Sequence, residues 1–231
     1  MNIYFLVEGK KTEFKVYPKW LAILIPELER VNSFNEVIEN NYFIFSGNGY
    51  PSLLDNHFKN SILDINKQKN YDYLVVCLDS DDDEVEERKK EIINFMNDQN
   101  LKLNKKTKLE IIVQNKCFET WFLGNPKIFK SNPRSEFLKE CVTFYNIKVN
   151  DPELMGKING YENTVSDFHT TYLRNMLAER NVNYSKNNPN EVIEKYYLNE
   201  LIKRNKSTNH IPSFKYFIDF CETIRNSMNI V

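Results

Sequence analysis

The segment YDYLVVCLD, residues 71–79, decides the fold class, because its apolar residues run on without the alternation of a strand exposed on one face. Such a run is typical of a strand buried on both faces of a parallel sheet. The opening segment IYFLV, residues 3–7, has the same character, and further strands are expected at 42–46 and in KLEIIVQN at 108–115. Helical patterns separate these strands, so the sequence predicts an α/β fold with a parallel sheet flanked by helices.

Three helices are expected between these strands. Apolar residues at steps of three or four predict a helix after the first strand, which Pro18 and Pro26 would kink or divide into two pieces. A second helix is expected to begin near Pro51, and a third covers the charged residues 83–97.

The pattern changes after Pro126, where the strand signals end. We therefore expect an α/β core at residues 1–126 and an α-helical C-terminal extension at 127–231. The helices expected in the extension cover residues 135–145, 164–180, 190–204 and 213–227.

The composition is that of an ordinary globular protein of 231 residues, with 31 basic and 32 acidic side chains. The resulting net charge of −1 provides no overall attraction to nucleic acid, so a basic patch would have to be local. The four cysteines never form CxxC, which favours buried free thiols over a zinc site. With a strand from residue 3 and no apolar run near 18 residues, we expect a cytoplasmic protein without membrane association.

Carboxylates follow several of the expected strands. Glu8 comes directly after the first strand, and Asp79 and Asp81 come at the end of the strand at 71–78. Because ligands of a parallel sheet collect beyond the carboxyl ends of its strands, we expect these acids at one edge, with Asp79 and Asp81 pointing the same way while the chain stays extended. Glu119 follows the last strand. Oxygen ligands gathered in this way favour Mg²⁺.

Simpler explanations exist for the same residues. The acidic run after Asp79 also suits a helix N-terminus, and Thr12 could cap a helix with Glu13 in its first turn. Glu119 could be solvated beside a core Trp121. Either Lys10 or Lys11 contacts a phosphate, or both are plain surface residues. Structural roles are expected for the three histidines, His57, His169 and His210.

Three motifs resemble those of the RloB-like proteins, a group within the TOPRIM superfamily that is related to the OLD-type nucleases. VEGKKTEFKVYPKWL, residues 7–21, is similar to their EGxxTExxYF opening, and YDYLVVCLDSDDDE, residues 71–84, is similar to their second strand with its acidic DxD. NKCFETWFLGNP, residues 115–126, is similar to their NPCFExWLL motif, with Lys116 where proline is usual. FSGNGYPSL, residues 45–53, resembles the glycine turn of OLD-type TOPRIM domains.

The resemblance implies a TOPRIM-like catalytic core and a Mg²⁺- or Mn²⁺-dependent nuclease with one or two ions, acting on DNA or RNA in anti-phage defence. It further implies a chain-separate ATPase of the ABC or AAA type as partner, and a homo-oligomer is an additional expectation. By this resemblance Glu8 is the general acid/base or a metal-associated carboxylate, and Asp79 and Asp81 are metal ligands. The accessory carboxylates of a second metal are Glu13, Asp83 and Glu119, with Glu119 also counted in the catalytic set. The phosphate contacts expected are Lys10, Lys11, Lys116 and Lys186.

Two other functions remain open. A strand-end DxD also suits a glycosyl- or nucleotidyltransferase, although VEGKKTE and CFETW would have no role there. A non-catalytic TOPRIM-like module that senses or scaffolds through its helical half is the other alternative. In that half, bases mixed with aromatics could follow a phosphate backbone, or they could be the solvated faces of amphipathic helices. These bases are Lys186, Lys203, Arg204, Lys206 and Lys215.

Overall fold

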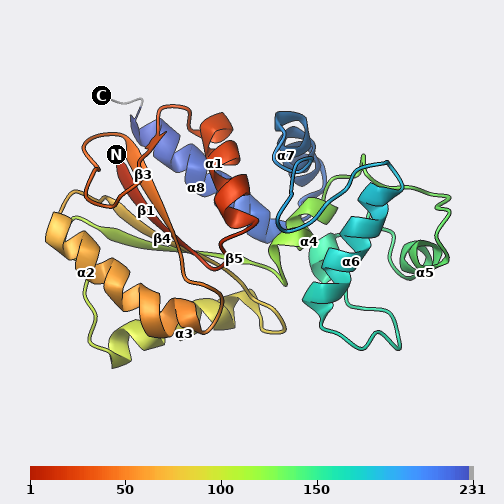
Figure 1. Cartoon of the computed structure of the whole chain (residues 1–231), viewed down its shortest axis with the longest axis horizontal. Helices are drawn as coiled ribbons and strands as arrows, with labels where there is room; N and C mark the ends of the chain where they lie inside the picture. Colours follow the sequence, from red (N-terminus) through yellow and green to blue (C-terminus); the bar gives the residue numbers. More distant parts are fainter. Residues whose placement is uncertain (229–231) are drawn as a thin grey trace. The chain divides into compact units, whose positions relative to one another are not determined.

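The computed structural model describes residues 1–228 and contains a five-stranded parallel sheet in the order β2-β3-β1-β4-β5 (Figure 1). The strands are β1 (Asn2–Val7), β2 (Glu29–Arg30), β3 (Asn41–Ser46), β4 (Tyr73–Asp79) and β5 (Lys108–Gln114). The predicted α/β fold with a parallel sheet flanked by helices is thereby confirmed. Only the two-residue edge strand β2 was not expected.

The chain divides into two units by the contacts within each. Unit 1 comprises Met1–Leu78, Val85–Val113 and the stretch that begins at Phe217, and unit 2 comprises Asp79–Glu84 and Gln114–Tyr216. This division differs from the predicted boundary after residue 126. Most of the last helix belongs with the sheet, because Phe217 packs on rings of the first helix.

Strand β1 is the centre of unit 1. It pairs in parallel with β3 on one side and β4 on the other, so that Ile3 lies opposite Tyr42 and Tyr73. All six residues of β1 are buried. Tyr4 and Leu6 join one apolar cluster, whereas Phe5 stacks on a ring of the opposite layer. The unbroken apolar pattern therefore has a direct cause, since both faces of β1 are covered.

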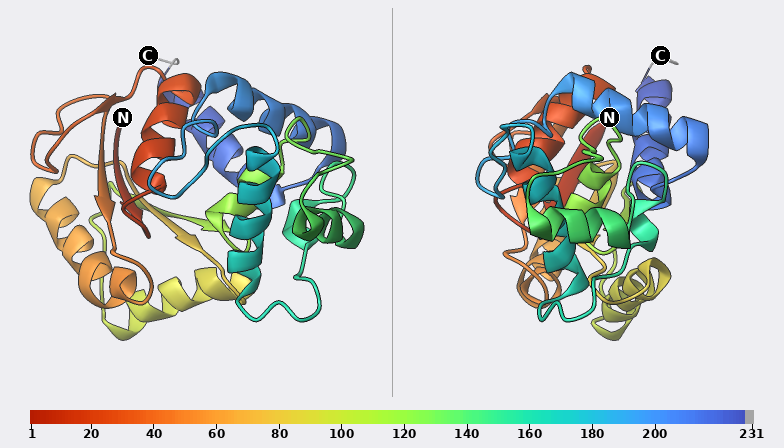
Figure 2. Two further views of the ribbon diagram at one scale, coloured as in Figure 1. Left: turned by 45° about the vertical axis from the view of Figure 1, so that its right-hand side comes forward. Right: turned by 90° about the vertical axis from the view of Figure 1, so that its right-hand side faces the viewer.

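Two helical layers cover the sheet of unit 1 (Figure 2). One face carries the π-helical turn η1 (Leu53–Phe58), α2 (Lys59–Gln68) and α3 (Val85–Asp98). On the other face lie α1 (Glu13–Leu24) and the unit 1 part of α8 (Pro212–Met228). There the ring of Phe217 lies 5.5 Å from that of Tyr17 and 6.3 Å from that of Trp20.

Helix α1 corrects one expectation. It runs as one continuous helix through Pro18 and ends at Leu24, before Pro26, so of the two expected outcomes, a kink or a division, the division into two pieces is wrong. Proline removes one backbone hydrogen bond, but burial of Val16, Tyr17, Trp20 and Leu21 holds the helix on the sheet.

Unit 2 is helical, as predicted for the C-terminal half. Its helices are α4 (Phe118–Leu123), α5 (Glu136–Phe144), the 3₁₀ turn η2 (Pro152–Leu154), α6 (Val165–Ala178) and α7 (Lys195–Thr208). Helix α4 was not expected, because its six residues are all buried and show no amphipathic period. Among the described residues, no helix is long and apolar enough to cross a membrane.

Gly47 shows how closely η1 approaches the end of β3. A Cβ placed on Gly47 would lie 2.5 Å from Leu53 Cβ and 2.7 Å from Leu53 Cα. The Gly47 N–H also donates to Val7 O at 2.8 Å, which ties this turn to β1. A side chain therefore does not fit at this position without moving η1.

We predict that Gly47→Ala lowers the free energy of unfolding by roughly 1–3 kcal/mol, because the new methyl group overpacks the contact with Leu53. Urea denaturation followed by circular dichroism measures this loss. Gly156→Ala is the matched control, since no atom lies within 4 Å of a Cβ at Gly156. Equal stability of the two variants would contradict the close packing at Gly47.

Candidate functional site

Glu8 lies at the end of β1 in unit 1, with a half-buried side chain. Its backbone N–H donates to Cys77 O at 2.9 Å, and its carbonyl oxygen accepts from Gly49 N at 2.9 Å. The backbone at Glu8 is thus held by β4 and by the glycine turn after β3. This turn contains a second glycine, Gly49, with φ +89°.

Glu13, the first residue of α1, folds back onto the loop before the helix. Its Oε1 accepts from Gly9 N at 2.9 Å, and a Cβ on Gly9 would lie 2.5 Å from that same oxygen. Glycine at position 9 is what allows this approach. Thr12 stands at the N-cap position with Glu13 in the first turn, as the simpler explanation expected, but its side chain makes no capping hydrogen bond. The two lysines of this loop, Lys10 and Lys11, are exposed.

The acidic loop 79–84 belongs to unit 2 and is not extended. Asp79 ends β4 and is half-buried, whereas Asp81 and Asp83 are exposed. Asp83 N donates to Ser80 O at 3.0 Å, and Asp81 has φ +52°. Asp79 and Asp81 were expected to point the same way while the chain stays extended, and this condition is not met, because a turn begins at Ser80. Since α3 begins at Val85, the helix-terminus explanation of these acids remains open.

Lys116 fixes this acidic loop through its backbone. Its N–H donates to Ser80 Oγ at 2.9 Å, and its carbonyl oxygen accepts from Asp81 N at 2.9 Å. Ser166 Oγ, at the start of α6, lies 3.2 Å from both Lys116 O and Asp81 Oδ1. Sequence reasoning missed Ser166, which is 85 residues from Asp81 along the chain.

The backbone conformation of Lys116 departs from the motif that it resembles. Lys116 has φ +67° and uses its N–H in a hydrogen bond. Proline has φ near −65° and no N–H, so the proline that is usual at this motif position does not fit this backbone. The third motif is therefore matched by the residues on both sides of position 116, but the backbone at position 116 is not the one that proline would impose.

Glu119 lies on α4 and is only 1% exposed, so the solvated alternative is wrong. Its Oε1 accepts from the hydroxyl of Tyr184 at 2.9 Å, a partner that sequence reasoning missed. The charges of Glu119 and Asp79 add to burial, the larger cause, in raising the pKa of the Cys117 thiol well above its usual range. Two of the expected acids, Asp79 and Glu119, thus act on one buried thiol.

Buried hydrogen bonds anchor the helix that carries Glu119. Trp121 is fully buried, as expected of a core residue, and its Nε1 donates to Ser213 Oγ at 2.7 Å. Ser213 Oγ donates in turn to Glu153 Oε1 at 2.6 Å. Burial raises the pKa of Glu153 to about 7, although the hydrogen bonds from Ser213 and Asn115 act in the opposite direction.

His169 supports the same helix from α6. Its Nε2–H donates to Met155 O at 2.9 Å, so its Nδ1 accepts from the hydroxyl of Thr120 at 2.8 Å. Burial lowers the pKa of His169 to about 4, which keeps the ring neutral. The other histidines also make hydrogen bonds to protein groups, His57 to Asn48 and His210 to Arg204.

The four cysteines, which the sequence predicted to be buried free thiols, are all buried and unbonded to one another: Cys77, Cys117, Cys141 and Cys221.

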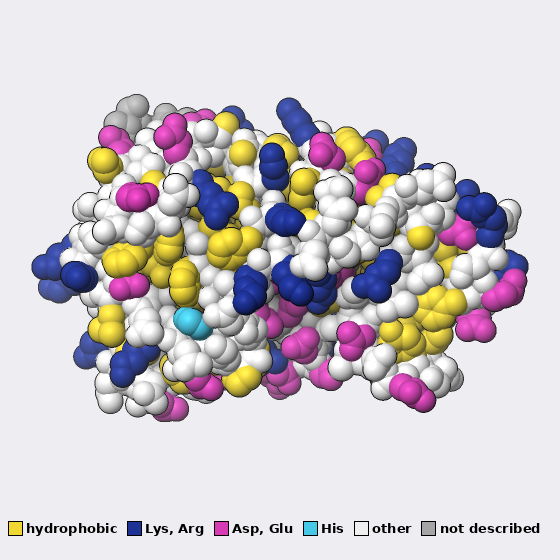
Figure 3. Space-filling model, viewed as in Figure 1, with side chains coloured by type: hydrophobic (Ala, Val, Ile, Leu, Met, Phe, Trp, Pro, Cys, Tyr) yellow, Lys and Arg dark blue, Asp and Glu magenta, His cyan; other side chains and the backbone are white. Residues whose placement is uncertain are grey.

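Lys186 is exposed in the segment between α6 and α7. In the part of the chain that the structure describes, no three or more His, Cys, Asp or Glu side chains form a group that could hold a metal ion. Both signs of charge are interspersed on the face drawn in Figure 3.

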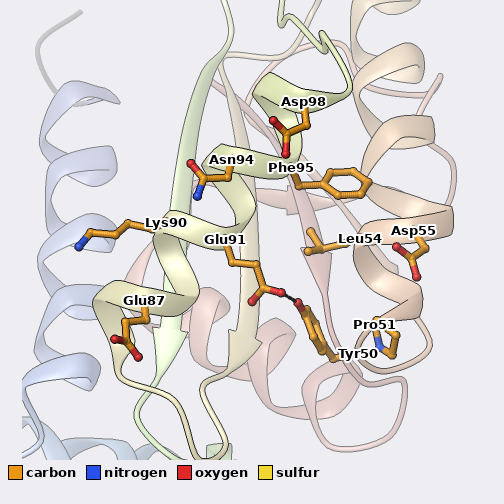
Figure 4. A pocket seen from close by; sticks show the side chains of 10 residues that line it. All are labelled: Tyr50, Pro51, Leu54, Asp55, Glu87, Lys90, Glu91, Asn94, Phe95 and Asp98. Atoms are coloured by element: carbon orange, nitrogen blue, oxygen red, sulfur yellow. Dashed lines mark hydrogen bonds between the residues drawn. The ribbon is translucent and has the colours of Figure 1, made fainter.

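Unit 1 contains a pocket of about 660 Å³, and none of the expected site residues lines it. Acidic side chains dominate its charged lining (Figure 4). The Tyr50 hydroxyl donates to Glu91 Oε1, and the Arg88 guanidinium lies 4.2 Å from the centre of the Tyr50 ring. Burial, followed by the bond to Glu91, raises the pKa of Tyr50 to about 12. These contacts join Tyr50 of the loop before η1 to two side chains of α3.

Comparison with protein-family models, with curated proteins and with solved structures returned no match. The resemblance of the three motifs therefore stays a prediction.

The positive φ of Lys116 predicts an unusual order of stabilities at this position. The free energy of unfolding of Lys116→Gly should lie within about 1 kcal/mol of the wild-type value, because glycine adopts φ +67° without strain. Lys116→Pro should lose about 3 kcal/mol or more, since it forbids this φ and removes the bond to Ser80. Urea denaturation of both variants measures the difference. Similar stability of the proline and glycine variants would show that Lys116 adopts another backbone conformation in solution.

The pKa values of Glu153 and His169 predict opposing effects of pH on stability. The raised pKa of Glu153 gives stability that is present below its unfolded value near 4.5 and is lost as pH rises through about 7. The lowered pKa of His169 gives stability that is present above its unfolded value near 6.5 and is lost as pH falls toward about 4. Between pH 7 and pH 4.5 the two contributions offset each other.

Glu153→Gln should therefore expose the effect of His169. We expect the free energy of unfolding of this variant, relative to the wild type, to fall by about 2–3 kcal/mol from pH 7 to pH 4.5. Urea unfolding in a Trp20→Phe background reports on unit 2, because the remaining Trp121 lies there. Glu162→Gln, an exposed acid, is the control. Parallel pH curves for Glu153→Gln and wild type would refute the proposed offset.

Proposed function

We propose that this protein is a Mg²⁺-dependent nuclease that hydrolyses phosphodiester bonds in DNA or RNA. The observation that supports it best is the order of the sheet. The chain leaves β1 for the β3 side and leaves β4 for the β5 side, so the connections reverse between these two parallel neighbours. Ligands of open parallel sheets bind beyond the carboxyl ends of strands at such a reversal. Glu8 follows β1, and Asp79 ends β4.

The donor chemistry at these strand ends suits Mg²⁺. Mg²⁺ takes oxygen ligands and commonly binds through one or two carboxylates, with waters and substrate phosphates in the remaining positions. A Mg²⁺ site therefore does not require a group of three or more His, Cys, Asp or Glu ligands, and residues 1–228 contain no such group. Asp79 and Asp81 would hold such an ion, with Asp83 and Glu13 as accessories to a second one.

The proposal assigns a role to each of the candidate site residues that follow. When bound, Mg²⁺ would supply a polarised phosphoryl oxygen and a water of lowered pKa. Glu8, on its fixed backbone, would accept or return a proton as general acid/base. Ser166 would orient Asp81, whose Oδ1 lies 3.2 Å from Ser166 Oγ. Glu119 is buried and accepts a hydrogen bond from Tyr184, so its contribution would be to hold α4 in place.

The biological setting follows from the motif resemblance. It supports anti-phage defence, together with a separate ATPase of the ABC or AAA type.

A non-catalytic TOPRIM-like module is the second candidate. Two observations favour it. The backbone of Lys116 departs from the motif of the catalytic relatives that the sequence resembles. The acids of the described chain form no three-ligand group. Such a module would keep the fold and bind partners without cleaving nucleic acid.

Cleavage should depend on Mg²⁺ or Mn²⁺ and should fall by about 10²-fold or more in Glu8→Gln and in Asp79→Asn. The assay incubates plasmid, single-stranded DNA and total tRNA with each protein, with and without metal. Asp82→Asn, an exposed acid of the same loop, is the matched control and should cleave like the wild type.

Calorimetry with Mn²⁺ separates the two candidates. A nuclease should bind the ion at a specific site that Asp79→Asn weakens. Equal cleavage by all variants would exclude the proposed acids. Absence of both cleavage and specific metal binding, also after co-expression with the ATPase, would favour the non-catalytic module.

A further inference from the structure

A second pocket, of about 520 Å³, lies within unit 2 and carries a strong positive charge. Its lining includes five cationic side chains and one carboxylate, Glu200, which is a formal excess of four positive charges. The cations are Lys127, Lys148, Arg180, Lys203 and Arg204. The whole chain has a net charge of −1, so this excess is a local concentration and not a property of the composition.

The two arginines of this cationic pocket are held by neutral groups. Arg180 donates from Nε to Ile128 O at 2.8 Å and from Nη2 to Phe129 O at 2.9 Å. A guanidinium has five N–H donors, so Arg180 keeps donors for a ligand. These carbonyls fix its orientation without cancelling its charge.

Arg204 provides a fixed charge beneath the surface, with 4% of its area exposed. It donates to Gly124 O at 3.1 Å and to Asn150 O at 2.7 Å, and Nη2 lies 3.1 Å from His210 Nδ1. Burial lowers the pKa of Arg204, while the charge of Asp151 acts in the opposite direction.

The cations of the pocket form no ion pairs with protein carboxylates among the described residues. Within residues 1–228, none of the five cations has a carboxylate oxygen within 4.0 Å. The hydroxyls of Ser207 and Thr208 both donate to Arg204 O, so they offer no donor to a ligand. Recognition in this pocket would therefore rest on positive charge and on guanidinium N–H groups.

We infer that the cationic pocket binds a phosphate group. Planar guanidinium donors match phosphate oxygens, and lysines add unspecific charge. The volume lies in the range of pockets for small ligands, so it has room for the molecule that carries the phosphate. The phosphate can belong to a nucleic acid backbone or to a free phosphorylated compound such as a nucleotide. The inference does not depend on the proposed nuclease activity, because it uses none of the proposed catalytic residues.

Calorimetric titration of the full chain tests this inference. The ligands are inorganic phosphate, AMP, and an oligothymidylate that has backbone phosphates but no terminal phosphate. Arg180→Gln and Lys203→Gln should each weaken binding of phosphate by about tenfold, the effect of losing one charge-assisted contact. Glu200→Gln should tighten it, because it removes the one carboxylate of the lining. Arg174→Gln, an exposed arginine of α6 outside the lining, is the control and should bind like the wild type.

The ligands then identify the source of the phosphate. Arg180-dependent binding of oligothymidylate, weakening with salt, would assign a nucleic acid backbone. Arg180-dependent binding of AMP without the oligonucleotide would assign a free phosphorylated compound. Absence of saturable binding of phosphate, AMP and the oligonucleotide, equal loss in Arg174→Gln, or equal affinity for acetate at matched ionic strength would each overturn the inference. Circular dichroism of every variant confirms that it is folded.

Discussion

Burial of β1 on both of its faces is the constraint on which the rest of unit 1 depends. Its backbone is paired on both edges, with β3 and β4, so it has no free edge to expose. Its side chains alternate between two helical layers, with Tyr4 in one and Phe5 in the other. A charged or polar replacement in β1 would therefore have no route to water. The loop that carries Glu8 starts from this most constrained strand.

Unit 2 depends on a different kind of interaction, a chain of buried polar contacts. The short helix α4 is too small to be stable alone, and buried side chains hold it from several directions. Trp121 reaches Ser213, Thr120 reaches His169 and Glu119 reaches Tyr184. Each of these bonds satisfies a group whose burial would otherwise cost stability. The same bonds that fix the geometry at Glu119 therefore make the stability of unit 2 sensitive to the loss of any one partner.

The sequence was sufficient where local pattern and burial agree. The apolar runs of β1 and β4 and the periodic helices of the C-terminal half predicted the parallel sheet and the helical extension. It was insufficient for α4, whose fully buried residues have no period, and for Asp81, where a non-glycine residue adopts a positive φ. Chain-distant partners such as Ser166 and Tyr184 carry no local signal either. The cations around Arg180 come from separate segments, and only folding brings them to one pocket.

The buried thiols give each unit its own reporter of opening. Cys77 and Cys221 lie in unit 1, and Cys117 and Cys141 lie in unit 2. Burial raises the pKa of all four, so in the native state they are both shielded and poor nucleophiles. A thiol reagent can therefore react at a measurable rate only when the surrounding structure opens. The time course at each cysteine would follow the local opening of its own unit, without any engineered cysteine.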